Sequence, residues 1–317
     1  MAQRRTGRGC LKTILPVALL LILGVVGAAV WLGYYATQPP RSRYLVTPEA
    51  FAQLSARGLR VTDEQWPNRD GTRARGWLLR GAERAPAVVL LHGYGGDRSW
   101  LLNLGVKLNE TTNFTVLWPD LRGHGENPLV QWTSFGAREA EDTLAALDYL
   151  RSLKVPAGRP LAGERIGIYG LEMGAYVALQ AAARDQSIRA LVLDSAPAAP
   201  DEVLQIAVDK RTGMKNPVFR EMARYGVRAY FLGRYENQPA CAAAAALGNR
   251  KVLLLSGDDA GPLRDSTLAL AQCFAGNAGL DVKANLPLTG LNLVALTGEQ
   301  GETYDRRVIN FFDTTLR

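Results

Sequence analysis

The sequence contains little histidine and little cysteine. Its 317 residues include two histidines, His92 and His124, and three cysteines. Three cysteines are too few for the disulfide framework of a small secreted domain. Two histidines without a Cys-x-x-Cys pair also exclude the ligand spacings typical of zinc sites. We therefore expect no metal and no other cofactor.

Acidic residues are absent from the first 43 positions, which carry six basic residues. The rest of the chain carries 31 basic and 30 acidic residues, so nearly all of the formal net charge of +7 belongs to the N-terminal segment. A nearly neutral body lacks the basic surface that neutralises a phosphate backbone. Nucleic acid is therefore not an expected partner.

A long uncharged run follows the N-terminal basic residues. No residue from Thr13 to Ala36 is charged, and about 20 apolar residues suffice to cross the hydrocarbon core of a bilayer. Trp31, Tyr34 and Tyr35 are typical of an interfacial aromatic belt, and the basic flank predicts a cytoplasmic N-terminus. We expect a single-pass protein with a basic cytoplasmic segment (1–12), a transmembrane anchor (13–36), a linker (37–44) and an extracytoplasmic body (45–317).

Two alternatives to a retained anchor are a cleaved signal peptide and a buried core helix. A signal peptide has a shorter apolar stretch, usually about 7–15 residues, and the charge pattern disfavours a core helix. The lipid bilayer is therefore an expected partner through this helix. Cys241 and Cys273 would lie in the extracytoplasmic body, where a disulfide persists, but the sequence leaves open whether they meet.

The body alternates short apolar runs with helical patterns. Strands that alternate with helices predict a mostly parallel, doubly wound α/β sheet, and the segment 200–249 is long enough for two or three helices that cap it. The predicted strands are 60–66, 73–79, 87–91, 114–118, 165–169, 188–193 and 251–256, and the predicted helices are 137–153, 175–184, 263–274 and 302–316.

Three glycine-containing motifs stand at the ends of predicted strands: HGYGG at 92–96, DLRGHG at 120–125 and GLEMG at 170–174. With these motifs in this order, the chain from about Arg60 onward resembles the α/β-hydrolase superfamily, in particular its serine-aminopeptidase and acyl-esterase-like branch. The resemblance implies an α/β-hydrolase fold whose nucleophile lies in a Gly-x-Ser-x-Gly turn between a strand and a helix.

The turn departs from that pattern at its centre. Gly170 and Gly174 are retained, but Glu172 stands at the nucleophile position. In the family, backbone N–H groups that would correspond to Met173 and Tyr94 form the oxyanion hole. Because a helix N-terminus favours negative charge, we expect the Glu172 carboxylate to fold into this hole and fill it.

The other two members of the triad are also replaced. The position that matches the family acid is Ala260, beside Asp258 and Asp259, and the position that matches the histidine is Leu291. A serine nucleophile needs a base, and the ester formed by a carboxylate nucleophile needs a base to activate water. These replacements predict a catalytically inactive protein.

Two functions from different classes remain. The first is a pseudoenzyme that acts as a binding or scaffold module for an unidentified protein or small-molecule ligand. The alternative is an active hydrolase of acyl esters or peptides with a carboxylate-based site around Glu172, Asp258 and Asp259. Ser99 and Ser195 are weaker candidates for a displaced nucleophile, and we expect structural roles for the two histidines.

Overall fold

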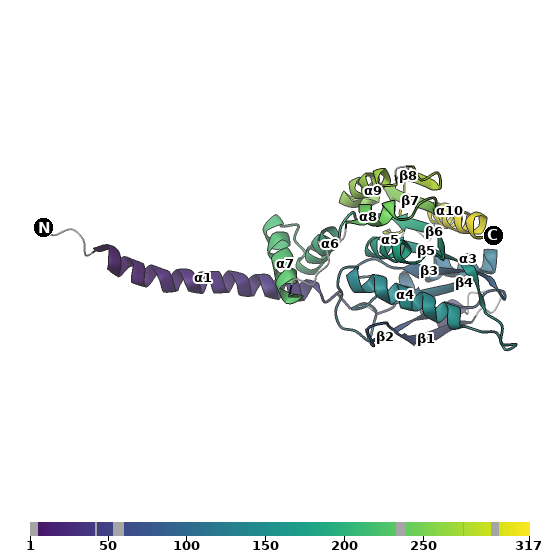
Figure 1. The fold of residues 1–317 in the computed structure, drawn as a ribbon, viewed down its shortest axis with the longest axis horizontal. Helices are drawn as coiled ribbons and strands as arrows, with labels where there is room; N and C mark the ends of the chain where they lie inside the picture. The colour runs from purple at the N-terminus through teal and green to yellow at the C-terminus, as the bar shows by residue number, and fades with distance from the viewer. Residues whose placement is uncertain (1–5, 42, 53–59, 233–238, 275, 293–297) are drawn as a thin grey trace.

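A long N-terminal helix projects from an α/β body in which helices cover both faces of one sheet (Figure 1). The structure is a computed structural model, and it describes residues 6–41, 43–52, 60–232, 239–274, 276–292 and 298–317. The predicted mostly parallel sheet with a preceding apolar helix is confirmed.

Within the described residues the sheet has eight strands in the order β1-β2-β4-β3-β5-β6-β7-β8. Strand β2 runs antiparallel to both of its neighbours, whereas β4, β3, β5, β6, β7 and β8 run parallel. The strands are β1 Val61–Pro67, β2 Arg73–Leu79, β3 Ala85–Leu91, β4 Thr115–Pro119, β5 Ala162–Leu171, β6 Ile188–Asp194, β7 Lys251–Gly257 and β8 Leu280–Leu286.

The central strands are continuously apolar because helices pack on both of their faces. One core contains side chains of α4, α5, α8 and α9, and the other contains side chains of α3 and α10. The body helices are α2 Pro48–Ala52, α3 Leu102–Thr112, α4 Ala137–Ser152, α5 Met173–Arg184, α6 Pro200–Thr212, α7 Pro217–Tyr230, α8 Ala240–Ala245, α9 Pro262–Gln272 and α10 Glu299–Leu316, with 3-10 turns at Arg98–Leu101 and Asp258–Ala260.

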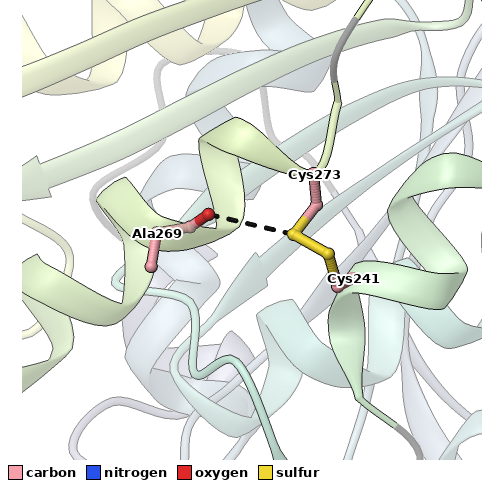
Figure 2. The surroundings of a disulfide bond; sticks show 3 residues. All are labelled: Cys241, Ala269 and Cys273. Carbon is pink, nitrogen blue, oxygen red and sulfur yellow. Dashed lines mark hydrogen bonds between the residues drawn. A yellow bond between two sulfur atoms is a disulfide. The ribbon is translucent and has the colours of Figure 1, made fainter.

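The segment 200–249 contains α6, α7 and α8, and we call α6 and α7 the cap. Figure 1 shows α7 lying beside the end of the N-terminal helix, with α6 next to it. A disulfide joins Cys241 of α8 to Cys273, directly after α9, with their Cα atoms 5.0 Å apart (Figure 2). This bond answers the pairing question that the sequence left open.

The N-terminal helix α1 spans Thr6–Ala36. Its 23-residue stretch Ile14–Ala36 has a mean hydropathy of 2.6 and is mostly exposed, and it is long and apolar enough to cross a membrane by length and composition. A signal sequence near an N-terminus can have the same length and apolar composition.

The segment 37–44, which the sequence predicts to be a linker, makes hydrogen bonds to the body at several of its described residues. Thr37 is fully buried, and its carbonyl oxygen accepts a hydrogen bond from the Thr133 amide at 2.8 Å. The Tyr44 hydroxyl donates to Asp120 at 2.9 Å. Leu32 and Ala36 of α1 already belong to the core of the body. The end of α1 and the segment after it are therefore part of the fold, because their apolar side chains and backbone groups find partners on the body.

Candidate functional site

The predicted turn at 170–174 joins β5 to α5, and Glu172 lies at its tip. Glu172 has φ +52° and ψ −114°, a backbone conformation that costs a residue other than glycine about 1–3 kcal/mol. The flanking positions require glycine, because neighbouring backbone atoms lie too close to leave room for a Cβ. A Cβ on Gly170 would lie 2.2 Å from the carbonyl oxygen of Gly174, and one on Gly174 would lie 2.3 Å from that of Leu91. The turn is thus as tight as the motif predicts.

Glu172 is 3% exposed, and its carboxylate has two kinds of donor. Its Oε1 accepts a hydrogen bond from the backbone N–H of Tyr94 at 3.0 Å. Its Oε2 lies 3.1 Å from Nζ of Lys210, which projects from α6. Among the described residues, the hydrogen bonds of this carboxylate include no bond from the amide of Met173. Of the two expected donors, the structure therefore brings Tyr94 to the carboxylate.

Lys210 holds three parts of the site together. Besides its ion pair with Glu172, its ammonium donates to the carbonyl oxygen of Tyr94 at 2.7 Å. The lysine thus joins the cap to the turn before α5 and to the loop after β3. Our sequence reasoning did not find Lys210, because a lysine in a polar helical segment gives no signal that it points inward.

The loop after β3 is also tied to α1. The buried Tyr94 hydroxyl donates to the carbonyl oxygen of Ala36 at 2.8 Å. That carbonyl belongs to the last turn of α1, where no intrahelical amide is available to it. The residue whose amide contacts Glu172 therefore also satisfies the end of the apolar helix.

Both histidines are buried and bonded to the backbone. His92 Nδ1 lies 2.8 Å from the carbonyl oxygen of Gly93, and its Nε2 accepts from the Leu121 amide at 3.0 Å. His124 Nδ1 lies 2.9 Å from the carbonyl oxygen of Arg122. Burial lowers the pKa of His92 and lowers that of His124 well below its ordinary value. These contacts hold the loops after β3 and β4 in place.

The positions that match the family acid and histidine lie on neighbouring loops. Ala260 is buried, and Asp258 is exposed and pairs with Arg264 at 2.9 Å. The Asp259 carboxylate accepts from both the amide and the hydroxyl of Thr289, at 3.0 and 2.9 Å. Asp259 thereby holds the loop after β8, on which Leu291 packs against the core of the α3 and α10 face.

A buried acid, which sequence reasoning missed, holds the same loop. Asp194 at the end of β6 accepts from the Gly290 amide at 2.7 Å and from the Tyr304 hydroxyl. Burial raises the pKa of Asp194 to about 6. The position of Asp194 at the carboxyl end of a central strand is a signal in the sequence that could have identified it. The environment of Asp194, however, depends on Tyr304 of α10, which is far along the chain.

The two serines considered as displaced nucleophiles have structural contacts. The Ser99 hydroxyl donates to Asp97 and accepts from the Leu45 amide at 2.9 Å. The Ser195 hydroxyl donates to Asp194 at 2.8 Å. Each hydroxyl therefore bonds a carboxylate that has other donors, and the described residues place no histidine nitrogen against either one.

Solved structures of other proteins share this fold. An esterase of Pyrococcus furiosus superposes with a TM-score of 0.67 at 20% identity, covering 89% of this chain and 98% of that one. The structure of the α/β hydrolase GrgF of a Penicillium species superposes with a TM-score of 0.59 at 18% identity, covering 81% of this chain and 99% of that one. At these identities the likeness is one of fold.

Curated relatives match over shorter stretches. The polyketide transferase grgF of a Penicillium species is 28% identical over 167 residues, which cover 50% of this chain and 55% of that protein. The thiohydrolase aneE of Aspergillus aculeatus is 27% identical over 124 residues, 39% of this chain and 37% of that protein. The chain thus spans about half the length of these relatives, or less.

The family profile described as the alpha/beta hydrolase fold matches residues 86–259, from β3 to the acids after β7. That stretch contains the loop after β3, the turn at Glu172 and the cap, and its strand order and turn geometry agree with the match. The chain belongs to the α/β-hydrolase fold family.

Proposed function

We propose that this protein is a membrane-anchored member of the family that has lost hydrolase activity and acts as a binding or scaffold module outside the cytoplasm. The observation that carries the proposal is the carboxylate of Glu172 at the nucleophile position. It accepts the Tyr94 amide and pairs with Lys210. In this proposal the carboxylate fills the oxyanion hole in place of a reaction intermediate.

The contacts of Glu172 argue against a carboxylate nucleophile. A nucleophile must present a free lone pair to the substrate, and the ester it forms must then be attacked by activated water. The Glu172 oxygens are engaged by an amide and an ammonium, and the side chain is buried. The buried histidines bond to backbone groups of the loops after β3 and β4. In the described part of the chain, the Glu172 oxygens contact the Tyr94 amide and the Lys210 ammonium, and no histidine nitrogen is hydrogen-bonded to them.

The alternative is a hydrolase of acyl esters or peptides with a carboxylate-based site. This alternative is supported by the similarity of the chain to proteins named as an esterase and a thiohydrolase. The acids it would use have other partners, because Asp258 pairs with Arg264 and Asp259 holds Thr289. These contacts favour the inactive protein.

The anchoring part of the proposal is supported by α1 and by the disulfide. The described part of α1 is long and apolar enough to span a bilayer, and basic residues precede it, which predicts a cytoplasmic N-terminus. The Cys241–Cys273 bond suits an oxidising compartment on the other side. We propose that α1 is retained as the anchor, because its last turn is bonded to Tyr94.

A fluorophosphonate probe tests the proposal on the full chain in detergent micelles. Wild-type protein and Glu172→Ser should both remain unlabelled, because restoring a hydroxyl does not restore the missing base. Labelling of Glu172→Ser alone would mean that a base survives near the turn. Labelling of the wild type would indicate an active serine elsewhere, with Ser99→Ala and Ser195→Ala as the variants that locate it.

A further inference from the structure

The cap helix α7 crosses α1 at unusually close range. A Cβ on Gly226 of α7 would lie 1.8 Å from the carbonyl oxygen of Ala29, and a Cβ on Gly33 of α1 would lie 2.6 Å from backbone atoms of Gly226 and Val227. Small residues at a crossing allow two helix backbones to touch, as they do in helix pairs within membranes. The position of α7 along α1 is therefore fixed by backbone contact.

The crossing point coincides with the edge of the span. From Ile14 to Gly33, α1 rises about 30 Å at 1.5 Å per residue, which matches the thickness of a hydrocarbon core. Trp31 and Tyr34 are exposed near this end of the helix. The Tyr34 ring lies 5.7 Å from that of Tyr230 on α7. Tyrosine and tryptophan concentrate at membrane interfaces, so α7 lies at the level of such a belt.

The side of α7 next to this crossing is apolar and exposed. Val218 is 61% exposed and Tyr225 is 59% exposed, and Met222 lies between them in helical spacing. With Val25, Val26 and Ala29 of α1 they line a groove of about 530 Å³, which also includes Pro217 and Glu221. A soluble surface seldom carries such a patch beside an apolar helix.

The charges of α7 point to the same arrangement. Arg220 pairs with Asp209 at 2.9 Å and Arg224 pairs with Glu221, while Arg228 is exposed near the C-terminal end of the helix. A helix with one apolar side, aromatic residues and arginines on its polar side typically lies in the plane of a membrane interface. The groove then continues the lipid-facing surface of α1.

We propose that α7 is a second membrane contact. It lies in the headgroup layer on the side of the body, with Val218, Met222 and Tyr225 among the acyl chains of that leaflet, and lipid tails fill the groove between α7 and α1. This inference rests on the proposed anchoring by α1. It adds that the cap bearing Lys210 is held at the membrane surface, with α6 between the bilayer and the Glu172 site.

Quenching of a fluorophore by acyl-chain nitroxides tests the contact. The full chain carries Cys10→Ser, which removes the cysteine outside the disulfide. A single cysteine is then introduced at a chosen position and labelled with nitrobenzoxadiazole. The labelled protein is placed in phosphatidylcholine nanodiscs. Leu20→Cys reports on the span, and Val218→Cys and Tyr225→Cys report on α7. Thr314→Cys is the matched aqueous control, because α10 lies far from α1 (Figure 1).

We expect the nitroxides to reduce the fluorescence of labels at positions 20, 218 and 225 by at least half. The label at position 314 should keep its initial fluorescence. Quenching at position 20 without quenching at 218 and 225 would overturn the α7 contact and leave the anchor intact. An unquenched label at position 20 would contradict the anchor, and the α7 contact with it.

Discussion

The backbone N–H of Tyr94 donates to the carboxylate of Glu172 at 3.0 Å. This bond joins the loop after β3 to the turn before α5, the two segments that frame the oxyanion hole of a hydrolase with this fold. Lys210 closes the arrangement from the cap, with bonds to both residues. The geometry links a charge at the nucleophile position to the packing of the cap.

The Glu172–Lys210 ion pair should stabilise the folded protein. Lys210→Met leaves a buried carboxylate with one donor fewer, so we expect a loss of about 1–2 kcal/mol, discounted because the lysine side chain is 39% exposed. Glu172→Gln combined with Lys210→Met should cost less than the sum of the two single changes. Thermal unfolding in detergent measures these differences. The exposed Lys215→Met is the matched control, and additive losses would exclude coupling between Glu172 and Lys210.

Side chains added at the two glycines where α1 and α7 cross should lower the stability of the folded protein. Gly226→Ala and Gly33→Ala place a methyl group within 2.6 Å of backbone atoms of the opposite helix, so the helices must separate and the unfolding midpoint should fall by several degrees. Gly24→Ala and Gly27→Ala on the same helix α1 are the controls, because a Cβ there meets nothing within 4 Å. Equal midpoints for all four variants would show that the crossing does not contribute to stability.

Asp194 should make stability depend on pH. Burial raises the pKa of this carboxyl to about 6 from an ordinary value of 3.8. The folded protein therefore binds the proton of Asp194 more tightly than the unfolded chain does. Its contribution is fully present below the unfolded pKa and is lost as the pH rises through about 6. Relative to Asp194→Asn, the wild type should therefore lose up to about 3 kcal/mol between pH 4 and pH 7, at about 1.4 kcal/mol per pKa unit. Unfolding of both proteins across this range measures the difference, and a constant difference would contradict a raised pKa.

The disulfide should stabilise the region where α8 meets α9. It closes a loop with a sequence separation of 32, for which the chain-entropy relation gives about 3–4 kcal/mol. Cys241→Ser with Cys273→Ser should lower the unfolding midpoint accordingly, and reduction of the wild type should reproduce the effect. Cys10→Ser should leave the midpoint unchanged. A wild type whose midpoint is insensitive to reductant would speak against the bond.

Much of the fold is predictable from the sequence because its signals are local. Apolar runs of strand length predict β3 to β7, and the glycines around Glu172 predict the tight turn that the structure has. The edge strand β8 has no such signal, because its side chains alternate between exposed and partly buried. Helix α3 was also not predicted, since its polar residues mask the leucines that pack on the sheet.

The contacts of the site depend on residues that are distant in sequence. The approach of Lys210 to Glu172 depends on how α6 packs, and the role of Asp194 depends on Tyr304 of α10. The docking of α1 was not predictable either, because Leu32 and Ala36 have the same apolar character whether they face lipid or protein. Local patterns predict elements and turns, whereas packing decides which polar groups meet.

Hydrolysis of short-chain p-nitrophenyl esters by the full chain in detergent, beside Glu172→Ala, tests the central claim that the Glu172 site is catalytically inactive. We expect wild type and variant to give the same rate as detergent buffer alone, because the Glu172 carboxylate is engaged by the Tyr94 amide and the Lys210 ammonium. Turnover by the wild type that Glu172→Ala abolishes would contradict this account and identify a carboxylate mechanism.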